Sequence, residues 1–509
     1  MRKSILAMLG IIFGVGAAQT ACYTTTCEDT ETCPAPDDYI ADATTEEPPP
    51  PPGCDITVDP KDSPECLADS YAVFIDSNNG NDVANGTKAY PVKTLTHALT
   101  LLGKKPRIYI CGTGMLTEHV ELTSTVSLYG GFVCSSWEYN GKKTVVKSDG
   151  LSPALKVNRV KSEITVSDLH FEAQPGQNPG DSSIAAFTLS SSVTFKRTEF
   201  VAGLGVLGST GAAGATDTRT VTPGGDKNAT TTTPGAGVAC TCAAGGSTNG
   251  GKGGIPTKDG TTGASVPPVL NPTSPNDGAG GKGGTNDCST GSGQGDKGAD
   301  APAGVNGGAI ASLGSLTPAG WSPSDSNSGE NGSPGQGGGG GGGNDGAGGG
   351  GGCGGCGGSG GEGGGGGGSS IALLSYQSTV QLIGCSLLTG DAGDGGQGGN
   401  GGDGMGGVSM GNGGNGDPNN GCQGGNGGAG GAGGGGSGGA GGISAGVLYS
   451  GSAPVPDSDT IINPGAAGVP GIGGTSGKTG NGTVVAGNPG PNGLSGTMVS
   501  ADDWTVTSE

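Results

Sequence analysis

Aromatic and basic side chains are scarce in this sequence. Aromatic residues make up 4% of the 509 residues, and hydrophobic residues of all kinds make up 31%. So few large apolar side chains can build a core for only a minority of the chain. No Lys or Arg stands between Lys297 and Lys478, and the formal net charge is −21. Nucleic acids and anionic membrane surfaces attract basic proteins, so the composition argues against both as partners.

Histidine is also rare, which limits the catalytic chemistry available. His97 stands in a short amphipathic segment, His119 begins an apolar run, and His170 alternates with apolar neighbours. Ser/His/Asp catalysis needs a histidine between a nucleophile and an orienting acid, and no such arrangement is suggested here. We interpret all three as surface residues.

Glycine takes the place of the missing residue types. The chain contains 119 Gly and 32 Pro, and Gly-Gly-X triplets dominate long stretches such as residues 395–403. Two interpretations stay open. Such tracts can be disordered, because ordering each residue costs about 1–2 kcal/mol and little is buried in return. They can instead form bundled, polyglycine-II-like helices with three residues per turn, joined by hydrogen bonds of about 0.5–1.5 kcal/mol each. The three-residue period places the other residues on one edge, which favours partial order.

The amino terminus resembles an export signal. Two basic residues precede an apolar run at 5–18 that ends in small residues and is too short to span a membrane. We predict a signal peptide at 1–21, with lipidation of Cys22, because the Ala-Cys pair resembles a bacterial lipoprotein cleavage site. Cleavage after Ala18 would instead release a secreted protein. The expected location is the cell envelope, anchored by lipid to the outer membrane or cell surface, or otherwise outside the cell.

Exported proteins usually pair their cysteines, and the chain has 14. Cys353 and Cys356 have the spacing of a metal-binding pair, but no second pair or histidine stands nearby. We therefore predict a local disulfide between them. Besides Cys22, the disulfide candidates are Cys27, Cys33, Cys54, Cys66, Cys111, Cys134, Cys240, Cys242, Cys288, Cys353, Cys356, Cys385 and Cys422.

An internal repeat indicates the architecture of the folded part. ITVSDLHFEA at 164–173 recurs as VTFKRTEFVA at 193–202, and residues 182–203 match 369–390 without a gap. Alternating apolar positions in these segments predict inward-facing columns on stacked β coils. The glycine tracts leave after a coil's second strand and return at the next coil, so we interpret them as insertions at one corner.

The predicted organisation follows from these patterns. In chain order, we expect a signal peptide (1–21), a Cys/Pro-rich spacer (22–66), a capped β-helix body (67–202), a glycine-rich insertion (203–368), a β-helix coil (369–389), a second insertion (390–442), and a last coil with a glycine-rich tail (443–509).

Two stretches carry a resemblance to known families. IDSNNGNDVANGT, followed by the TLTHAL helix, resembles the amino-terminal cap of pectin-lyase-like β-helix proteins. GGGGGGSSIALLSYQSTVQL and GGAGGISAGVLYS look like junctions in glycine-rich, PGRS-type exported proteins of myxobacteria, many of them lipoprotein-like. The resemblance implies an all-β fold: a right-handed parallel β-helix with a cap helix and long glycine-rich loops. It implies no single activity, because this fold hosts lyases, hydrolases, adhesins and inert surface proteins.

One segment has the spacing of a calcium loop. Asp76, Asn78 and Asp82 offer side-chain oxygens at alternate positions, although Gly80 removes a ligand and no acidic residue closes the loop. An Asn/Gly/Asp-rich turn explains the same residues. No cofactor is therefore expected other than a structural calcium ion at this loop.

We predict a non-enzymatic cell-surface protein with a structural or adhesive role, and extracellular polysaccharide or matrix as its candidate partner. One alternative is a carbohydrate-active β-helix enzyme, a lyase or hydrolase, which needs outward acids beside a Lys or Arg. The outward positions of the matched coils hold Asp168, Arg197 and Gly384, which do not repeat one residue type. The other alternative is a non-catalytic carbohydrate-binding protein, for which Trp137, Tyr139 and Trp321 are the candidate aromatic platform. These patterns specify no oligomeric state.

Overall fold

The computed structural model describes residues 47–226, 232–269, 274–285, 287–288, 292–409, 421–479 and 484–507. The chain divides into two compact units, Met1–Pro49 and Pro50–Glu509. The fold described here is that of the second unit. The predicted leader, the lipidation site Cys22, and the candidates Cys27 and Cys33 lie outside the described residues.

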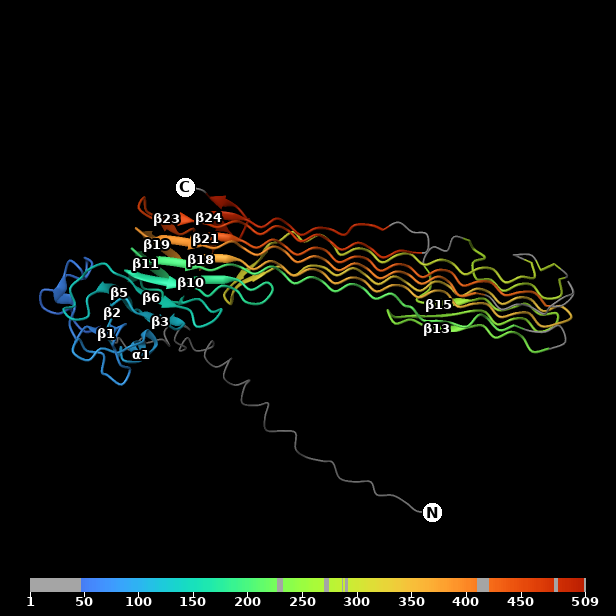
Figure 1. The fold of residues 1–509 in the computed structure, drawn as a ribbon, viewed down its shortest axis with the longest axis horizontal. Helices are drawn as coiled ribbons and strands as arrows, with labels where there is room; N and C mark the ends of the chain where they lie inside the picture. The colour runs from blue at the N-terminus through green and yellow to red at the C-terminus, as the bar shows by residue number, and fades with distance from the viewer. Residues whose placement is uncertain are drawn as a thin grey trace, which may run out of the picture. The chain divides into compact units, whose positions relative to one another are not determined.

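The second unit is nearly all β, and its main strands lie in parallel sheets (Figure 1). Sheet A contains, in spatial order, β1 (Ala72–Asp76), β2 (Arg107–Cys111), β5 (Ser127–Phe132), β8 (Ile164–Ser167), β11 (Ser192–Lys196), β19 (Thr379–Ile383) and β22 (Val455–Pro456). Sheet B contains β3 (Met115–Thr117), β6 (Thr144–Lys147), β9 (Leu169–Glu172), β12 (Glu199–Ala202), β20 (Ser386–Thr389) and β23 (Ile461–Asn463). Sheet C contains β4 (Val120–Leu122), β7 (Leu155–Asn158), β10 (Ser183–Leu189), β18 (Ser370–Tyr376), β21 (Ser444–Ser450), β24 (Ser495–Ser500) and β25 (Val506–Thr507).

From β2 to β24, successive strands of these sheets pass from sheet C to sheet A to sheet B, and the next strand returns to sheet C beside its predecessor. The matched segments of the sequence pair in parallel, with Val193 of β11 between Ile164 of β8 and Val380 of β19. In sheet B, Phe200 lies in the same way between Phe171 and Leu387. This arrangement is β-helix-like, as the sequence repeat predicts.

The core lies between the three sheets. Its columns are apolar because alternate residues of a strand point inward. Phe171, Phe195 and Phe200 have no exposed surface, and the Phe171 and Phe200 rings stack with centroids 5.8 Å apart. Burying each such ring stabilises the fold by about 1.5–3 kcal/mol.

A short helix, α1 (Leu95–Thr100), packs its apolar face on the first strands of the core. Leu95 and Ala98 are fully buried, and the Thr94 hydroxyl accepts a hydrogen bond from the His97 N–H at the helix start. The helix is shorter than the amphipathic segment 94–102 suggests, because residues 101–103 turn away into the next strand. At the other end of the sheets, β25 runs antiparallel to β24.

A second apolar cluster covers the outer face of sheet A. Phe74, Tyr109, Tyr129 and Phe132 point outward from their strands and pack together. Residues 60–71, which include the 3₁₀ turn Pro64–Cys66, lie on this cluster, and the Tyr109 hydroxyl donates to the carbonyl oxygen of Cys66 at 3.2 Å. The end of the predicted spacer therefore belongs to the second unit.

The glycine-rich segments run side by side, away from the sheets, toward β13 (Ala239–Thr241) and β15 (Ala264–Val266) (Figure 1). We number the tracts in chain order: tract 1 (203–216), tract 2 (292–308), tract 3 (327–343), tract 4 (346–368), tract 5 (390–409), tract 6 (421–442), tract 7 (464–479) and tract 8 (484–493). β13 and β15 flank β14 (Ser247–Asn249) in a small antiparallel sheet, and β16 (Gly314–Thr317) pairs with β17 (Gly320–Pro323).

Tracts 7 and 8 form an excursion that the sequence analysis assigned to a tail. They leave after β23 and return to β24, which adds a further strand to sheet C. Pro, Ala and Val interrupt the GGX triplets there, so the sequence does not identify the segment as a further excursion.

Candidate functional site

Backbone hydrogen bonds recur at every third residue along the tracts. The N–H groups of Gly205, Gly208, Gly211 and Gly214 in tract 1 donate to the carbonyl oxygens of Asp391, Asp394, Gln397 and Asn400 in tract 5, at 2.7–3.0 Å. The same period joins tract 4 to tract 6. A three-residue period is that of a polyproline-II-type helix, which makes no bonds within itself and leaves its backbone free to bond neighbours.

Tract 6 lies at the centre of this bundle. It exchanges backbone hydrogen bonds with tracts 2, 3, 4, 5, 7 and 8, and most of its residues are buried. Close approach of the neighbouring backbones leaves no room for a side chain at its glycines. A Cβ added at Gly433 would lie 2.0 Å from the carbonyl oxygen of Ser359, and one at Gly430 would lie 2.1 Å from that of Cys356.

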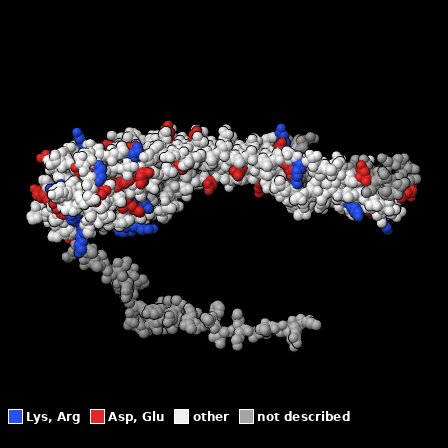
Figure 2. Space-filling model, turned by 60° about the horizontal axis from the view of Figure 1, so that its bottom comes forward, with Lys and Arg blue, Asp and Glu red and all other residues white. Residues whose placement is uncertain are grey.

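The acidic and amide residues of tract 5 have a structural use. The Asp391 and Asp394 carboxylates accept hydrogen bonds of 2.8 and 2.7 Å from the backbone N–H groups of Ala466 and Val469 in tract 7. Asn400 and Asp403 bind tract 7 in the same way. These side chains therefore satisfy N–H groups at an edge of the bundle. In the view of Figure 2, charged side chains are frequent over the sheets and sparse along the tracts.

Disulfides hold the tracts at the end away from the sheets. Cys240 pairs with Cys353, Cys242 with Cys356, and Cys288 with Cys422. The predicted local Cys353–Cys356 bond is therefore wrong. The two residues lie on an extended tract, and each meets a cysteine of the neighbouring segment at β13.

The cysteines near the sheets pair over shorter distances in sequence. Cys54 pairs with Cys66, and Cys111 pairs with Cys134. Cys385, also predicted as a disulfide candidate, is instead a free thiol, because it occupies an inward column where no other cysteine of the described residues lies. Burial raises the pKa of its thiol to about 11, so it is not a reactive nucleophile at neutral pH.

These disulfides are typical of an extracellular or secreted protein. Within the part of the chain that the structure describes, no helix has the length and apolarity to cross a membrane.

The predicted calcium loop uses its carboxylates to bind backbone amides. Asp76 accepts from the N–H groups of Asn78 and Asn79 at 2.8 and 2.9 Å. Asp82 accepts from the N–H groups of Lys93 and Thr94 at the start of α1. Burial opposes ionisation of Asp82, but these hydrogen bonds outweigh it and hold the pKa of its carboxyl below the usual value. Calcium at this loop stays a prediction.

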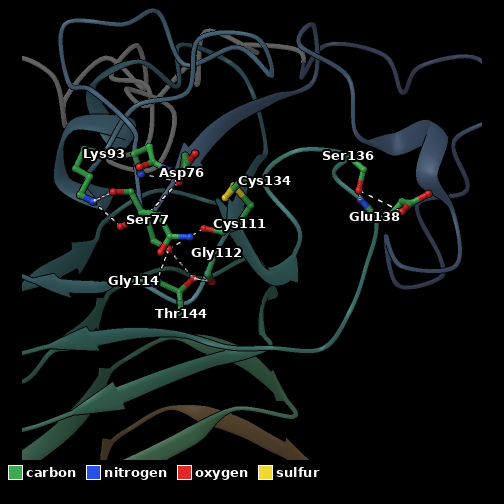
Figure 3. Close-up of a disulfide and its surroundings, with 12 residues drawn as sticks. Asp76, Ser77, Lys93, Cys111, Gly112, Gly114, Cys134, Ser136, Glu138 and Thr144 are labelled. Carbon is green, nitrogen blue, oxygen red and sulfur yellow. Dashed lines mark hydrogen bonds between the residues drawn. A yellow bond between two sulfur atoms is a disulfide. The ribbon is translucent and has the colours of Figure 1, made fainter.

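Asp76 also lies beside two sulfur atoms, those of Cys111 and Cys134, with the possible ligand atoms within 4.8 Å of one another (Figure 3). Both sulfurs belong to one disulfide. They offer no thiolate, so this group is not a metal site while the bond is intact.

A charged cluster that the sequence analysis missed lies on the outer face of sheet B. Lys143 Nζ lies 2.7 Å from Glu199 Oε1, and His170 Nδ1 lies 2.9 Å from Glu199 Oε2. Lys147 and Glu172, directly paired on β6 and β9, are 2.6 Å apart. Burial raises the pKa of the Glu199 carboxyl, but Lys143 and His170 together hold it below its usual value. The registers of β6, β9 and β12 would have revealed the cluster, whereas the sequence alone does not give them.

A second network joins sheet A to residues before it. Arg197 donates two hydrogen bonds to Asp168, at 2.9 and 2.7 Å, and forms a second ion pair with Asp59 at 3.0 Å. The hydrogen bonds to Asp168 raise the pKa of Arg197. Asp168 and Arg197 both have positive φ, 57° and 49°, and lie at the corner between sheets A and B. The aligned corner position is glycine in the next coil, Gly384, with φ 58°. A positive φ favours glycine, which accounts for Gly384 but not for the residue types at 168 and 197.

Of the predicted aromatic platform, Trp137 and Tyr139 come together and Trp321 does not. Trp137 and Tyr139 line one cleft beside Phe132. The Trp321 ring packs against Trp504, with centroids 6.0 Å apart, and its indole N–H donates to the Ser369 hydroxyl.

No protein-family model matches this chain. No curated protein matches it either. Among solved structures, a GH136 lacto-N-biosidase from Eubacterium ramulus is similar over 26% of this chain and 27% of its own, with 15% identity and a TM-score of 0.22. A likeness this limited carries no argument about activity.

Proposed function

We propose that this chain is a non-enzymatic extracellular protein with a structural or adhesive role, in which the three sheets support a stiff bundle of glycine-rich tracts. The observation that carries the proposal is the central position of tract 6, bonded through its backbone to tracts on all sides. A flexible brush would have no such bonds. Hydrogen bonds of about 0.5–1.5 kcal/mol each offset much of the entropy that ordering glycine costs.

Three finer features belong to the same proposal. The coils wind with a right-handed sense, which parallel connections in a sheet almost always adopt. The tracts are polyglycine-II-like helices, in accord with their three-residue hydrogen-bond period. A lipid on Cys22 tethers the protein to the outer membrane or cell surface, and this rests on the sequence of the leader.

Hydrogen exchange of the purified mature protein, read by mass spectrometry, tests the bundle. Amides of tract 6 should exchange as slowly as those of β10 and β18, because both sets are buried and bonded. Complete exchange of tract 6 within seconds, with β10 and β18 still protected, would contradict a stiff bundle. Mass analysis of the mature amino terminus separately tests the lipid on Cys22.

The charged cluster on sheet B supports a second candidate, a carbohydrate-active enzyme. It brings Glu172, Glu199 and His170 together with Lys143 and Lys147 on one outer face. Both acids are, however, held by lysines at 2.6–2.7 Å, which suits a structural network as well as catalysis. A panel of polysaccharides assayed for new reducing ends distinguishes the two. Activity that falls about 100-fold or more in Glu199→Gln would support the enzyme, and no product with any substrate favours the structural role.

A further inference from the structure

A cleft of about 400 Å³ lies at the edge of the aromatic cluster that covers sheet A. One wall comes from residues 60–67 and the other from the loop at 132–139. The Cys54–Cys66 and Cys111–Cys134 disulfides hold these two segments, so the walls are fixed covalently near the cleft.

Aromatic rings form the apolar part of the cleft, in a chain with few aromatic residues. Phe132, Trp137 and Tyr139 line it. The Trp137 ring packs edge-on against Phe74 with centroids 4.8 Å apart, and Tyr139 packs edge-on against Phe132 at 6.0 Å. These contacts hold the rings in place before a ligand binds, so little side-chain entropy is lost on binding.

Hydrogen-bond donors and acceptors border the rings. Lys88, Ser136 and Glu138 line the same cleft. The Lys88 ammonium lies 5.7 Å from the centre of the Phe74 ring. Within the described residues, neither that ammonium nor the indole N–H of Trp137 donates a hydrogen bond. Glu138 accepts from the Ser136 hydroxyl at 3.2 Å and keeps other lone pairs free (Figure 3).

We propose that this cleft binds a pyranose oligosaccharide. A pyranose ring presents C–H groups on its faces and hydroxyl groups around its rim, so it needs a flat apolar surface bordered by donors and acceptors. The Trp137 and Tyr139 rings supply the surface, Lys88 and the indole N–H supply donors, and Glu138 supplies an acceptor. The assignment rests on the proposed adhesive role and gives it a ligand class.

Tryptophan fluorescence tests this site directly, because the chain contains only three Trp residues. The full mature protein is titrated with cellohexaose, which is neutral, and with a mannuronate hexamer, which is anionic. We expect a saturable fluorescence change with at least one of them. Trp137→Phe should abolish the change and weaken binding, measured by calorimetry, by about tenfold or more. Trp504→Phe is the matched control and should retain both the change and the affinity.

Glu138→Gln keeps the proposal testable if the Trp137 variant folds poorly, because Glu138 is exposed. It should weaken binding by about three- to tenfold without changing the unfolding temperature. No binding of either sugar at about 1 mM would overturn the proposal, as would binding that Trp137→Phe and Glu138→Gln leave unchanged. Hydrogen exchange of tract 6 is recorded on the same samples. Protected tracts without sugar binding would refute the cleft alone, whereas unprotected tracts would refute the stiff bundle.

Discussion

Gly433 lies in the middle of tract 6, and its replacement by Ala tests whether the tracts pack as the structure describes. The added Cβ would lie 2.0 Å from the carbonyl oxygen of Ser359 in tract 4. That oxygen also accepts the N–H of Gly402, and the Gly433 N–H donates to the Gly402 carbonyl at 2.9 Å. Relief of the clash must therefore move tract 4 or tract 6 and disturb bonds among three tracts.

The expected cost can be estimated from these contacts. Forcing a methyl group into a packed region costs about 1–3 kcal/mol. Each backbone hydrogen bond lost adds about 1 kcal/mol. A local loss of about 3 kcal/mol corresponds to a roughly 100-fold increase in amide exchange through local opening. We expect that increase around Gly433 and in the facing part of tract 4, measured by exchange mass spectrometry.

Gly406→Ala is the matched control, because a Cβ at Gly406 in tract 5 meets no atom within 4 Å. Since Ala reduces the entropy of the unfolded chain, this variant should be neutral or stabilised by up to about 1 kcal/mol. Equal exchange rates in the two variants would refute the close-packed bundle. Faster exchange in Gly406→Ala than in Gly433→Ala would refute it as well.

Further predictions concern the disulfides and the charged networks. Cys353→Ser breaks the bond to Cys240, but Cys242–Cys356 still closes nearly the same loop, so the chain-entropy account gives a loss of only about 2 kcal/mol, that of the short loop between the two bonds; proteinase K should then cleave the tracts near β13 faster than those near the sheets, and unchanged cleavage would contradict this. The pKa of Glu199 is lowered in the folded protein, so its ionised carboxylate stabilises the fold at pH values above the unfolded-state pKa, and this stabilisation is lost as pH falls through the folded-state pKa. Glu199→Gln should therefore flatten the fall of the unfolding temperature in acid, and an unchanged pH profile would contradict this. Arg197→Ala leaves Asp168, which is 3% exposed, without its main partner, and should cost about 3–5 kcal/mol in denaturant unfolding, whereas Arg197→Lys, which keeps the charge, should cost less.

Much of the coil arrangement could be predicted from the sequence. The gapless match between 182–203 and 369–390 corresponds to strands that pair in register, as Ser183 with Ser370 and Phe200 with Leu387 show. The alternation of apolar residues identified the inward columns because a strand exposes successive side chains on opposite faces. The helix near residue 95 was also predicted, with its end misplaced by residues that turn into β2.

The candidate sites were harder to predict. The cluster joins Glu199 of β12 and His170 of β9 with Lys143, which directly precedes β6, and the match between coils did not extend to β6. The sequence does not mark Phe74, Tyr109, Tyr129 and Phe132 as a cluster, because it does not show that residues 60–71 fold back over them.

The sequence by itself determined which matched segments stack as coils, which of their residues face the core, and where the first two glycine insertions leave the sheets. Local alternation and repetition carry that information, since each coil contacts its neighbours in order. The tertiary structure alone decided how the tracts pack and which cysteines pair. Glycine has no side chain, so its sequence pattern does not indicate which tract it will pack against. The contact of Gly433 with tract 4 and the bond of Cys353 with Cys240 both depend on where distant segments come together.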